Sequence, residues 1–122
     1  MGTKIILSFL LIGSIAYTQS KDEVHLLKQY SLQKCLKINY HSVDSTFISH
    51  DYSASYMLQV KNADYNMLNK LDDFTAKNTS QFYEMGVSEN LEDSKANYIF
   101  CHCMDFYESK ELDKFIKKVL KK

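Results

Sequence analysis

The sequence predicts an all-α fold, a small bundle of four or five helices with one intramolecular disulfide, after a cleaved signal peptide. The chain has no proline, and Gly86 is the only glycine beyond the N-terminal region. Sheet-rich domains need turn glycines and prolines, so their scarcity favours helices joined by polar loops. Apolar residues also recur every three or four positions along several segments. No internal repeat is present, and the length of 122 residues is typical of one domain.

We interpret residues 1–20 as a secretory signal peptide. Lys4 precedes the apolar run at residues 5–12, and small residues follow. A positive charge, a short apolar core and small residues near a cleavage site are the three parts of such a peptide. The run is too short to cross a membrane, which takes roughly 20 apolar residues, so we expect no stable membrane insertion. A buried first helix is the alternative.

The mature domain is expected to span residues 21–122. Cleavage after Ala16 satisfies the small-x-small pattern, and Thr18 and Ser20 are alternative sites. An exported domain meets oxidising conditions in which disulfides persist. The chain has 15 basic and 15 acidic residues, and every basic residue is lysine. The absence of arginine disfavours nucleic-acid binding, for which the guanidinium group is the preferred side chain.

The first helix is predicted over residues 22–40. Its inward stripe contains Val24, Leu27, Ser31, Cys35 and Ile38, spaced by three or four residues. This spacing places Cys35 toward the core.

Two further helices are predicted in the middle of the chain, at residues 50–61 and from Asp64 to residue 75 or beyond. Asp64 is a typical N-cap residue. Tyr52, Tyr56 and Tyr65 fit the core, with their hydroxyl groups at its rim. Tyrosines are also frequent in protein interfaces, which is the second interpretation.

An exposed acidic loop is predicted at residues 85–94, which lack a helical stripe. A fourth helix follows at residues 94–107. The last helix begins at Ser109, with Glu111 and Asp113 in its first turn and four lysines toward its end. These charges complement the helix dipole at both ends.

Three cysteines allow one disulfide and leave one thiol. Cys101 and Cys103 point roughly 200° apart on one helix, so they do not ligate one metal ion together. Cys103 shares an apolar face with Ile99 and Phe106, whereas Cys101 shares a mixed face. We therefore predict a Cys35–Cys103 disulfide, which would stabilise the fold by about 4 kcal/mol. Cys101 is then either an inert thiol or a link between subunits.

No catalytic, metal or cofactor site is predicted. The chain lacks the serine-hydrolase, zinc-protease and phosphate-loop motifs, and no CxxCH haem motif occurs. Its four histidines are scattered and are interpreted as surface or capping residues. A small exported domain of this kind is expected to be a binding protein and not an enzyme.

Two segments resemble the immunity proteins of type VI secretion amidases. The first-helix pattern matches at Tyr30, Ser31, Leu32, Cys35 and Leu36. The C-terminal signature matches at Cys103, Asp105, Tyr107, Ser109, Lys110, Glu111, Leu112 and Asp113. Cys101 departs from the family pattern, and the middle of the chain diverges.

The resemblance implies an all-helical periplasmic bundle, often a homodimer, that inhibits a cognate peptidoglycan amidase delivered by neighbouring cells. The amidase would be a papain-like hydrolase with a cysteine–histidine active site. The family's cysteine pair would correspond to Cys35 and Cys103.

Occlusion of the amidase cleft is the expected mechanism of inhibition. We expect the exposed acidic loop to enter the cleft, where an activated cysteine lies in electropositive surroundings. The loop candidates are Ser88, Glu89, Glu92 and Asp93, and those on the exposed side of the third helix are Asn66, Lys70 and Asp73. These residues are chosen for their exposure and charge and lie outside the family signature. The alternative function is a secreted helical carrier of a small hydrophobic ligand, held among interior Tyr, Phe and Met side chains.

Overall fold

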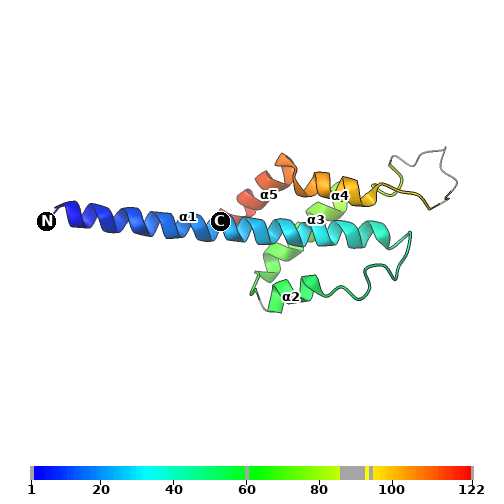
Figure 1. Cartoon of the computed structure of the whole chain (residues 1–122), viewed down its shortest axis with the longest axis horizontal. Coiled ribbons are helices and arrows are strands. Elements are labelled where there is room, and N and C mark those ends of the chain that lie inside the picture. Colours follow the sequence, from blue (N-terminus) through cyan, green and yellow to red (C-terminus); the bar gives the residue numbers. More distant parts are fainter. Residues whose placement is uncertain (1, 60, 86–92, 94, 122) are drawn as a thin grey trace.

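The computed structural model describes the backbone of residues 2–59, 61–85, 93 and 95–121, and their side chains from residue 21 onward. Five helices and no strand are present in these residues. In chain order they are α1 (Gly2–Tyr40), α2 (Ser53–Gln59), α3 (Tyr65–Thr79), α4 (Ile99–Tyr107) and α5 (Lys110–Leu120) (Figure 1). The predicted all-α class is confirmed.

Helix α1 is the central element of the bundle. It packs against α2, α3, α4 and α5, and these are the most extensive contacts between helices. In Figure 1, α4 and α5 follow one side of α1, α2 lies on the other side, and α3 lies behind it. The predicted stripe is confirmed at Val24, Leu27, Ser31 and Cys35, which are buried, whereas Ile38 is only half-buried.

The observed start of α1 differs from the prediction. We expected the helix to begin near residue 22, and it begins at Gly2. No proline separates the apolar N-terminal run from the amphipathic segment, so the helical backbone continues through both. Within the part of the chain that the structure describes, no helix has the length and hydrophobicity required to cross a membrane. Cleavage of the first 20 residues stays a prediction.

Helix α2 is shorter than predicted, and the core interpretation of the tyrosines is wrong. It has seven residues, none of them buried. Ala54, Met57 and Leu58 pack partly against the core. Tyr52 and Tyr56 instead leave more than half of their surface exposed, and Tyr65 at the start of α3 does the same. A helix of two turns covers the core with one narrow face, and Tyr56 lies outside that face. Tyr52 precedes α2, and Tyr65 is the first residue of α3.

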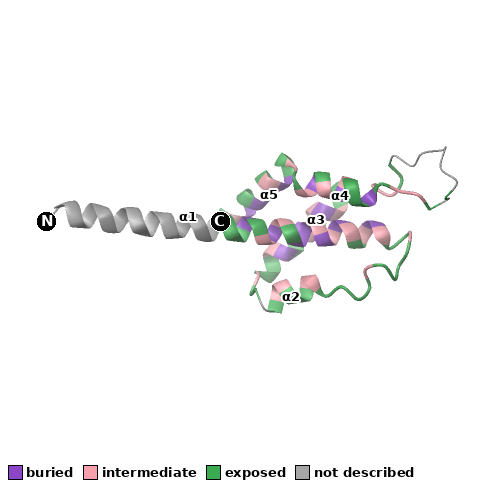
Figure 2. Ribbon diagram, in the orientation of Figure 1, coloured by how far each residue is buried: buried purple, intermediate pink, exposed green. Residues whose placement is uncertain are grey.

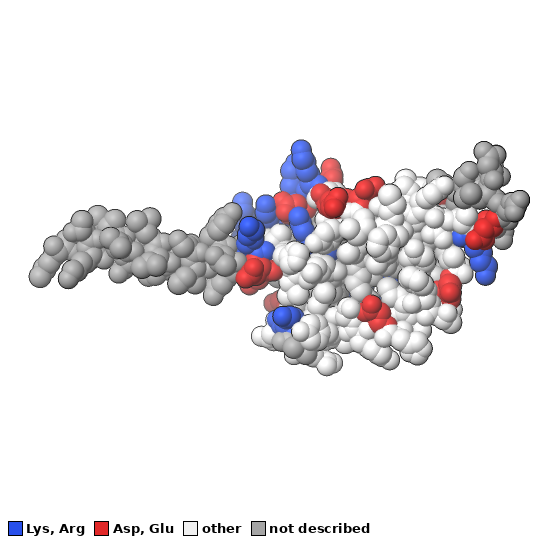
Figure 3. All heavy atoms as spheres, in the orientation of Figure 1, with Lys and Arg blue, Asp and Glu red and all other residues white. Residues whose placement is uncertain are grey.

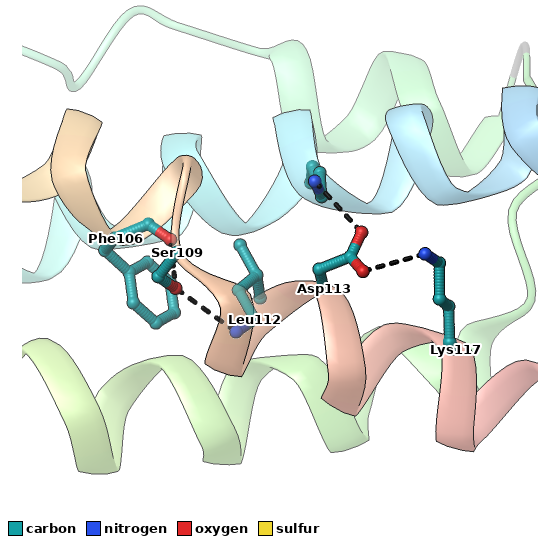
Figure 4. A network of polar contacts seen from close by, with 6 residues as sticks. Phe106, Ser109, Leu112, Asp113 and Lys117 are labelled. Atoms are coloured by element: carbon teal, nitrogen blue, oxygen red, sulfur yellow. Dashed lines mark hydrogen bonds and ion pairs between the residues drawn. The ribbon is translucent and has the colours of Figure 1, made fainter.

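Local capping explains where the later helices begin. The carboxylate of Asp64 accepts hydrogen bonds from the backbone N–H of Asn66 and Met67, as expected for an N-cap. Ser109 caps α5 by accepting a bond from the N–H of Leu112 at 3.2 Å. The Ser109 hydroxyl also donates to the carbonyl of Phe106, which ties the end of α4 to the start of α5 (Figure 4).

Helix α4 starts at Ile99, five residues later than predicted. The side chain of Asp93 accepts a bond from the N–H of Lys95, and that of Asn97 accepts one from the N–H of Ile99. Side-chain bonds of this kind compete with helical backbone bonds and hold the segment in turns.

The predicted disulfide is confirmed. Cys35 of α1 and Cys103 of α4 are bonded, with their Cα atoms 5.8 Å apart, and both side chains are fully buried. Leu71, Ile99, Leu112 and other buried side chains form the surrounding core, on the inward faces of the helices (Figure 2). Cys101 is an exposed free thiol, as its position on the opposite face predicted.

Candidate functional site

Helix α3 presents an outward stripe that contains three of the predicted binding residues. Asn66, Lys70 and Asp73 are all exposed. They share one face because their spacing of three and four residues follows the helical repeat. The opposite face is fixed in the core by Leu68, Leu71, Thr75 and Thr79. The structure therefore brings these three predicted side chains together on one helix face.

One groove runs beside this stripe, between α3 and α5. Its volume is about 450 Å³. The rings of Phe74 and Phe115 stack here, with their centroids 4.0 Å apart. Charged side chains at the groove are Lys70, Asp73, Lys77 and Lys118. An apolar surface bordered by charges is suited to binding another apolar group with a polar rim.

A second groove lies on the other side of the stripe, between α1 and α3, with a volume of about 470 Å³. It is lined by Lys34, Lys37, Ile38, His41, Asp72, Asp73 and Ala76. Asp73 borders both grooves. The outward stripe of α3 is therefore a ridge between two hollows, a shape that can dock against a concave partner.

Polar contacts fix the position of this ridge relative to α1. The Tyr30 hydroxyl donates a hydrogen bond of 2.9 Å to Asp72, and Lys34 lies 3.7 Å from the same carboxylate oxygen. Burial of Tyr30 and its bond to Asp72 raise the pKa of the hydroxyl well above its usual value. The hydroxyl therefore stays a donor at all physiological pH values.

Asp113 of α5 takes part in two ion pairs, one of which reaches α1. Asp113 lies 3.1 Å from the ammonium of Lys28 in α1 and 2.8 Å from that of Lys117 in α5 (Figure 4). The hydrogen bond with Lys117, followed by that with Lys28, lowers the pKa of the Asp113 carboxyl. The Lys117 pair lies within α5, whereas the Lys28 pair crosses to α1 and adds to the packing of the buried Leu112 and Ile116, which positions α5 as one wall of the α3–α5 groove.

Of the four predicted contact residues in the acidic loop, the structure describes only Asp93. Ser88, Glu89 and Glu92 lie outside the residues that the structure describes. Asp93 is exposed, and it precedes α4 on a different segment from the α3 stripe. The structure therefore groups the α3 residues with one another, and a role for the loop stays a prediction.

Three of the four histidines are exposed, as expected, and His102 is not. The His102 ring lies 5.4 Å from that of Phe82, and its Nε2 is buried without a hydrogen-bond partner among the described residues. The surface interpretation is therefore wrong for His102. Within the described part of the chain, no cluster of three or more His, Cys, Asp and Glu side chains has a metal-binding arrangement.

Sequence reasoning missed Phe47, which lies outside every predicted helix and is exposed. Its ring contacts that of Tyr40, at the end of α1, with the centroids 4.6 Å apart. The signal that could have found it is the unusual composition of the surrounding segment, which lacks lysine.

Comparison with known proteins identifies the family. The model of the Tai4 family, described as type VI secretion system (T6SS) amidase immunity protein, matches residues 25–116. The matched range includes both disulfide cysteines and the whole of α3. No curated protein and no solved structure matches the chain. The chain therefore belongs to the Tai4 family of T6SS amidase immunity proteins.

Proposed function

We propose that this protein is exported to the periplasm, where it binds a cognate T6SS peptidoglycan amidase and inhibits it by occluding the catalytic cleft. It protects the cell that makes it and catalyses no reaction itself. The amidase in this proposal is a papain-like hydrolase with a catalytic cysteine and histidine, and the inhibitor acts as a homodimer. Family membership supports the general role in immunity.

The observation that carries the proposal is the ridge on α3 between two grooves. Asn66, Lys70 and Asp73 project from a helix whose other face is locked in the core. A rigid convex element loses little conformational entropy on binding, which favours tight occlusion of a concave site. The acidic loop with Ser88, Glu89, Glu92 and Asp93 is the second proposed contact, because carboxylates are attracted to the electropositive surroundings of an activated cysteine.

Inhibition of the amidase by purified protein tests the proposal. The enzyme to use is a papain-like hydrolase encoded beside the gene of this protein, and peptidoglycan cleavage is the readout. We expect stoichiometric inhibition by the natural protein and at least about tenfold weaker inhibition when Asn66, Lys70 and Asp73 are all replaced by Ala. Unchanged inhibition by this triple variant would exclude the α3 ridge.

A matched control and a second variant separate the two proposed contacts. Lys110→Ala with Lys114→Ala changes exposed residues of α5 outside the α3–α5 groove, and it should leave inhibition unchanged. Replacement of Glu89, Glu92 and Asp93 by Ala tests the loop. Full inhibition by that variant would rule the loop out.

Sedimentation of the protein with and without Cys101→Ser tests the homodimer and the role of the free thiol in it.

The α3–α5 groove supports a second candidate function, that of a carrier of a small hydrophobic ligand. Its volume of about 450 Å³ lies within the range of small-molecule sites, and Phe74 and Phe115 give it an apolar lining. Native mass spectrometry of the protein as isolated tests this function. A bound lipid or chromophore would favour it, and a mass equal to that of the polypeptide would count against it.

A further inference from the structure

Residues 41–59 form a segment whose composition differs from the rest of the chain. We call it the lysine-free segment, because all 15 lysines lie outside it. It contains five serines, two tyrosines and one phenylalanine, and its only acidic residues are Asp44 and Asp51. Surfaces that bind proteins are depleted in lysine and glutamate and enriched in aromatic residues. Antibody paratopes, in particular, combine tyrosine with serine.

The aromatic side chains of this segment face solvent. Phe47 is 63% exposed, Tyr52 is 70% exposed and Tyr56 is 51% exposed. Figure 3 shows lysine and acidic side chains gathered over α5 and the adjoining part of α1, whereas the surface over α2 and the preceding connection is mostly uncharged, with isolated acidic groups and a basic group beside α2. The ammonium of Lys61, just after α2, lies 5.9 Å from the centroid of the Tyr56 ring. Large aromatic side chains exposed within one short segment indicate a candidate binding surface.

The segment is anchored to the bundle beneath these aromatics. Val43, Ala54, Met57 and Leu58 pack partly against the core. Asp44 accepts bonds from the N–H and hydroxyl of Thr46, and Asp51 accepts one from the N–H of Ser53. These bonds fix two turns and lower the pKa of both carboxyl groups, so both are ionised at neutral pH. The exposed aromatics are therefore held in a defined arrangement before a partner binds.

The charges of the segment indicate the kind of partner. A second copy placed symmetrically on this surface would bring together two segments that each carry two aspartates and no lysine, since a two-fold interface pairs a patch with its own copy. Such like-charge contacts are unfavourable. A partner with a basic rim gains attraction from both carboxylates. The nearby lysines flank the segment: Lys61 lies over the Tyr56 ring, and Lys95 is close enough to Asp44 to lower the pKa of its carboxyl.

We propose that the lysine-free segment is a contact surface for the inhibited amidase, and that it packs Tyr52, Tyr56 and Phe47 against a basic rim of that enzyme. This inference rests on the proposed function. It adds a second surface, built by the α1–α2 connection and α2, to the ridge on α3.

Two substitutions that introduce opposite charges at one position provide the sharpest test. Ser55 is exposed and lies on α2 between Tyr52 and Tyr56 in the sequence. We expect Ser55→Lys to raise the Kd for the neighbouring-gene amidase at least about tenfold, and Ser55→Glu to raise it much less. Tyr52→Ala and Tyr56→Ala should each raise Kd by a similar factor, because exposed aromatics dominate binding energy when they become buried. Titration calorimetry with the full, oxidised protein measures these values.

Two control variants lie outside the segment. Gln29→Lys adds the same charge on an exposed position of α1, and Phe100→Ala removes an exposed aromatic side chain of α4. Both should leave Kd within about twofold of the natural value. Circular dichroism verifies that each variant is folded, and Ser55→Lys decides the outcome if a tyrosine variant is not.

The possible outcomes are distinguishable. If the natural protein does not bind the amidase, the proposed function fails and this inference fails with it. If the natural protein binds and all segment variants bind equally well, only this inference is overturned. If Ser55→Lys and Ser55→Glu weaken amidase binding equally, the basic rim proposed for the amidase is wrong. If a segment variant sediments as a monomer where the natural protein sediments as a dimer, and the variant keeps its amidase affinity, the segment is a self-association surface. This result would also overturn the proposal.

Discussion

Two regions of the molecule place apolar side chains in opposite environments. One is the contact between α1 and α4, and the other is the lysine-free segment. At the first, Cys35, Ile99 and Cys103 are fully buried and a disulfide joins the two helices. In the second, Phe47 and Tyr52 expose more than half of their surface. Burial of apolar surface drives folding in the first region, and the second leaves its apolar surface available for a partner. Variants in the two regions should therefore affect different measurements, stability in one and recognition in the other.

Removal of the disulfide should have the largest effect on stability. The crosslink joins residues 68 positions apart, so its loss frees a long loop in the unfolded chain. Cys35→Ala together with Cys103→Ala should lower the free energy of unfolding by about 4 kcal/mol. Urea denaturation under oxidising conditions measures this change. Cys101→Ala is the control and should leave the midpoint unchanged, since that thiol is free and exposed. A small effect of the double variant would show that core packing alone holds α1 to α4.

A pair of neighbouring residues on α4 tests the buried region without touching the disulfide. Ile99 is fully buried, whereas Phe100 is 56% exposed. Ile99→Ala should cost about 3 kcal/mol, because it removes buried apolar atoms and leaves a cavity. Phe100→Ala should change the free energy of unfolding by less than about 0.5 kcal/mol. Equal losses in the two variants would contradict the assigned orientation of α4.

The ion-pair network at Asp113 should contribute a smaller, pH-dependent amount. Asp113→Asn should lower the free energy of unfolding by about 0.5 to 1 kcal/mol at pH 7. The pKa of this carboxyl is lowered in the folded protein, so its contribution is present above the unfolded pKa of about 3.9 and is lost as the pH falls through the folded value. Denaturation curves of the natural protein and the variant should therefore differ at neutral pH and converge in strong acid. A difference that persists in strong acid would show that the side chain acts by packing.

Tyr52→Ala should have the smallest effect on stability. The side chain is 70% exposed, so the free energy of unfolding should change by less than about 0.5 kcal/mol. Its effect on amidase affinity is expected to be large, and this separation of stability from binding is what distinguishes the segment from the α1–α4 contact. Thermal denaturation measures the first quantity, and titration calorimetry measures the second. A strongly lowered melting temperature would place Tyr52 with the core residues.

Helical periodicity and capping chemistry allowed much of the fold to be predicted. The inward stripe of α1 and the N-caps Asp64 and Ser109 depend on local spacing, which can be read directly from the sequence. The same spacing turns Cys35 and Cys103 inward, and this orientation identified the pair that forms the disulfide. The candidate site was only partly predictable. Exposure on α3 followed from the same periodicity, but the two grooves beside it arise from α1 and α5, which lie far away in the sequence.

By itself the sequence determined the helical class, the disulfide pair and the family, because each depends on residue type and spacing along one chain. Only the tertiary structure decided which aromatic residues are buried. Phe74 and Phe115 are half-buried and stack on each other, whereas Tyr56 faces solvent, although all three lie on helices. The physical reason is that burial depends on how much surface a neighbouring helix covers, and a two-turn helix such as α2 offers only one narrow face to the core.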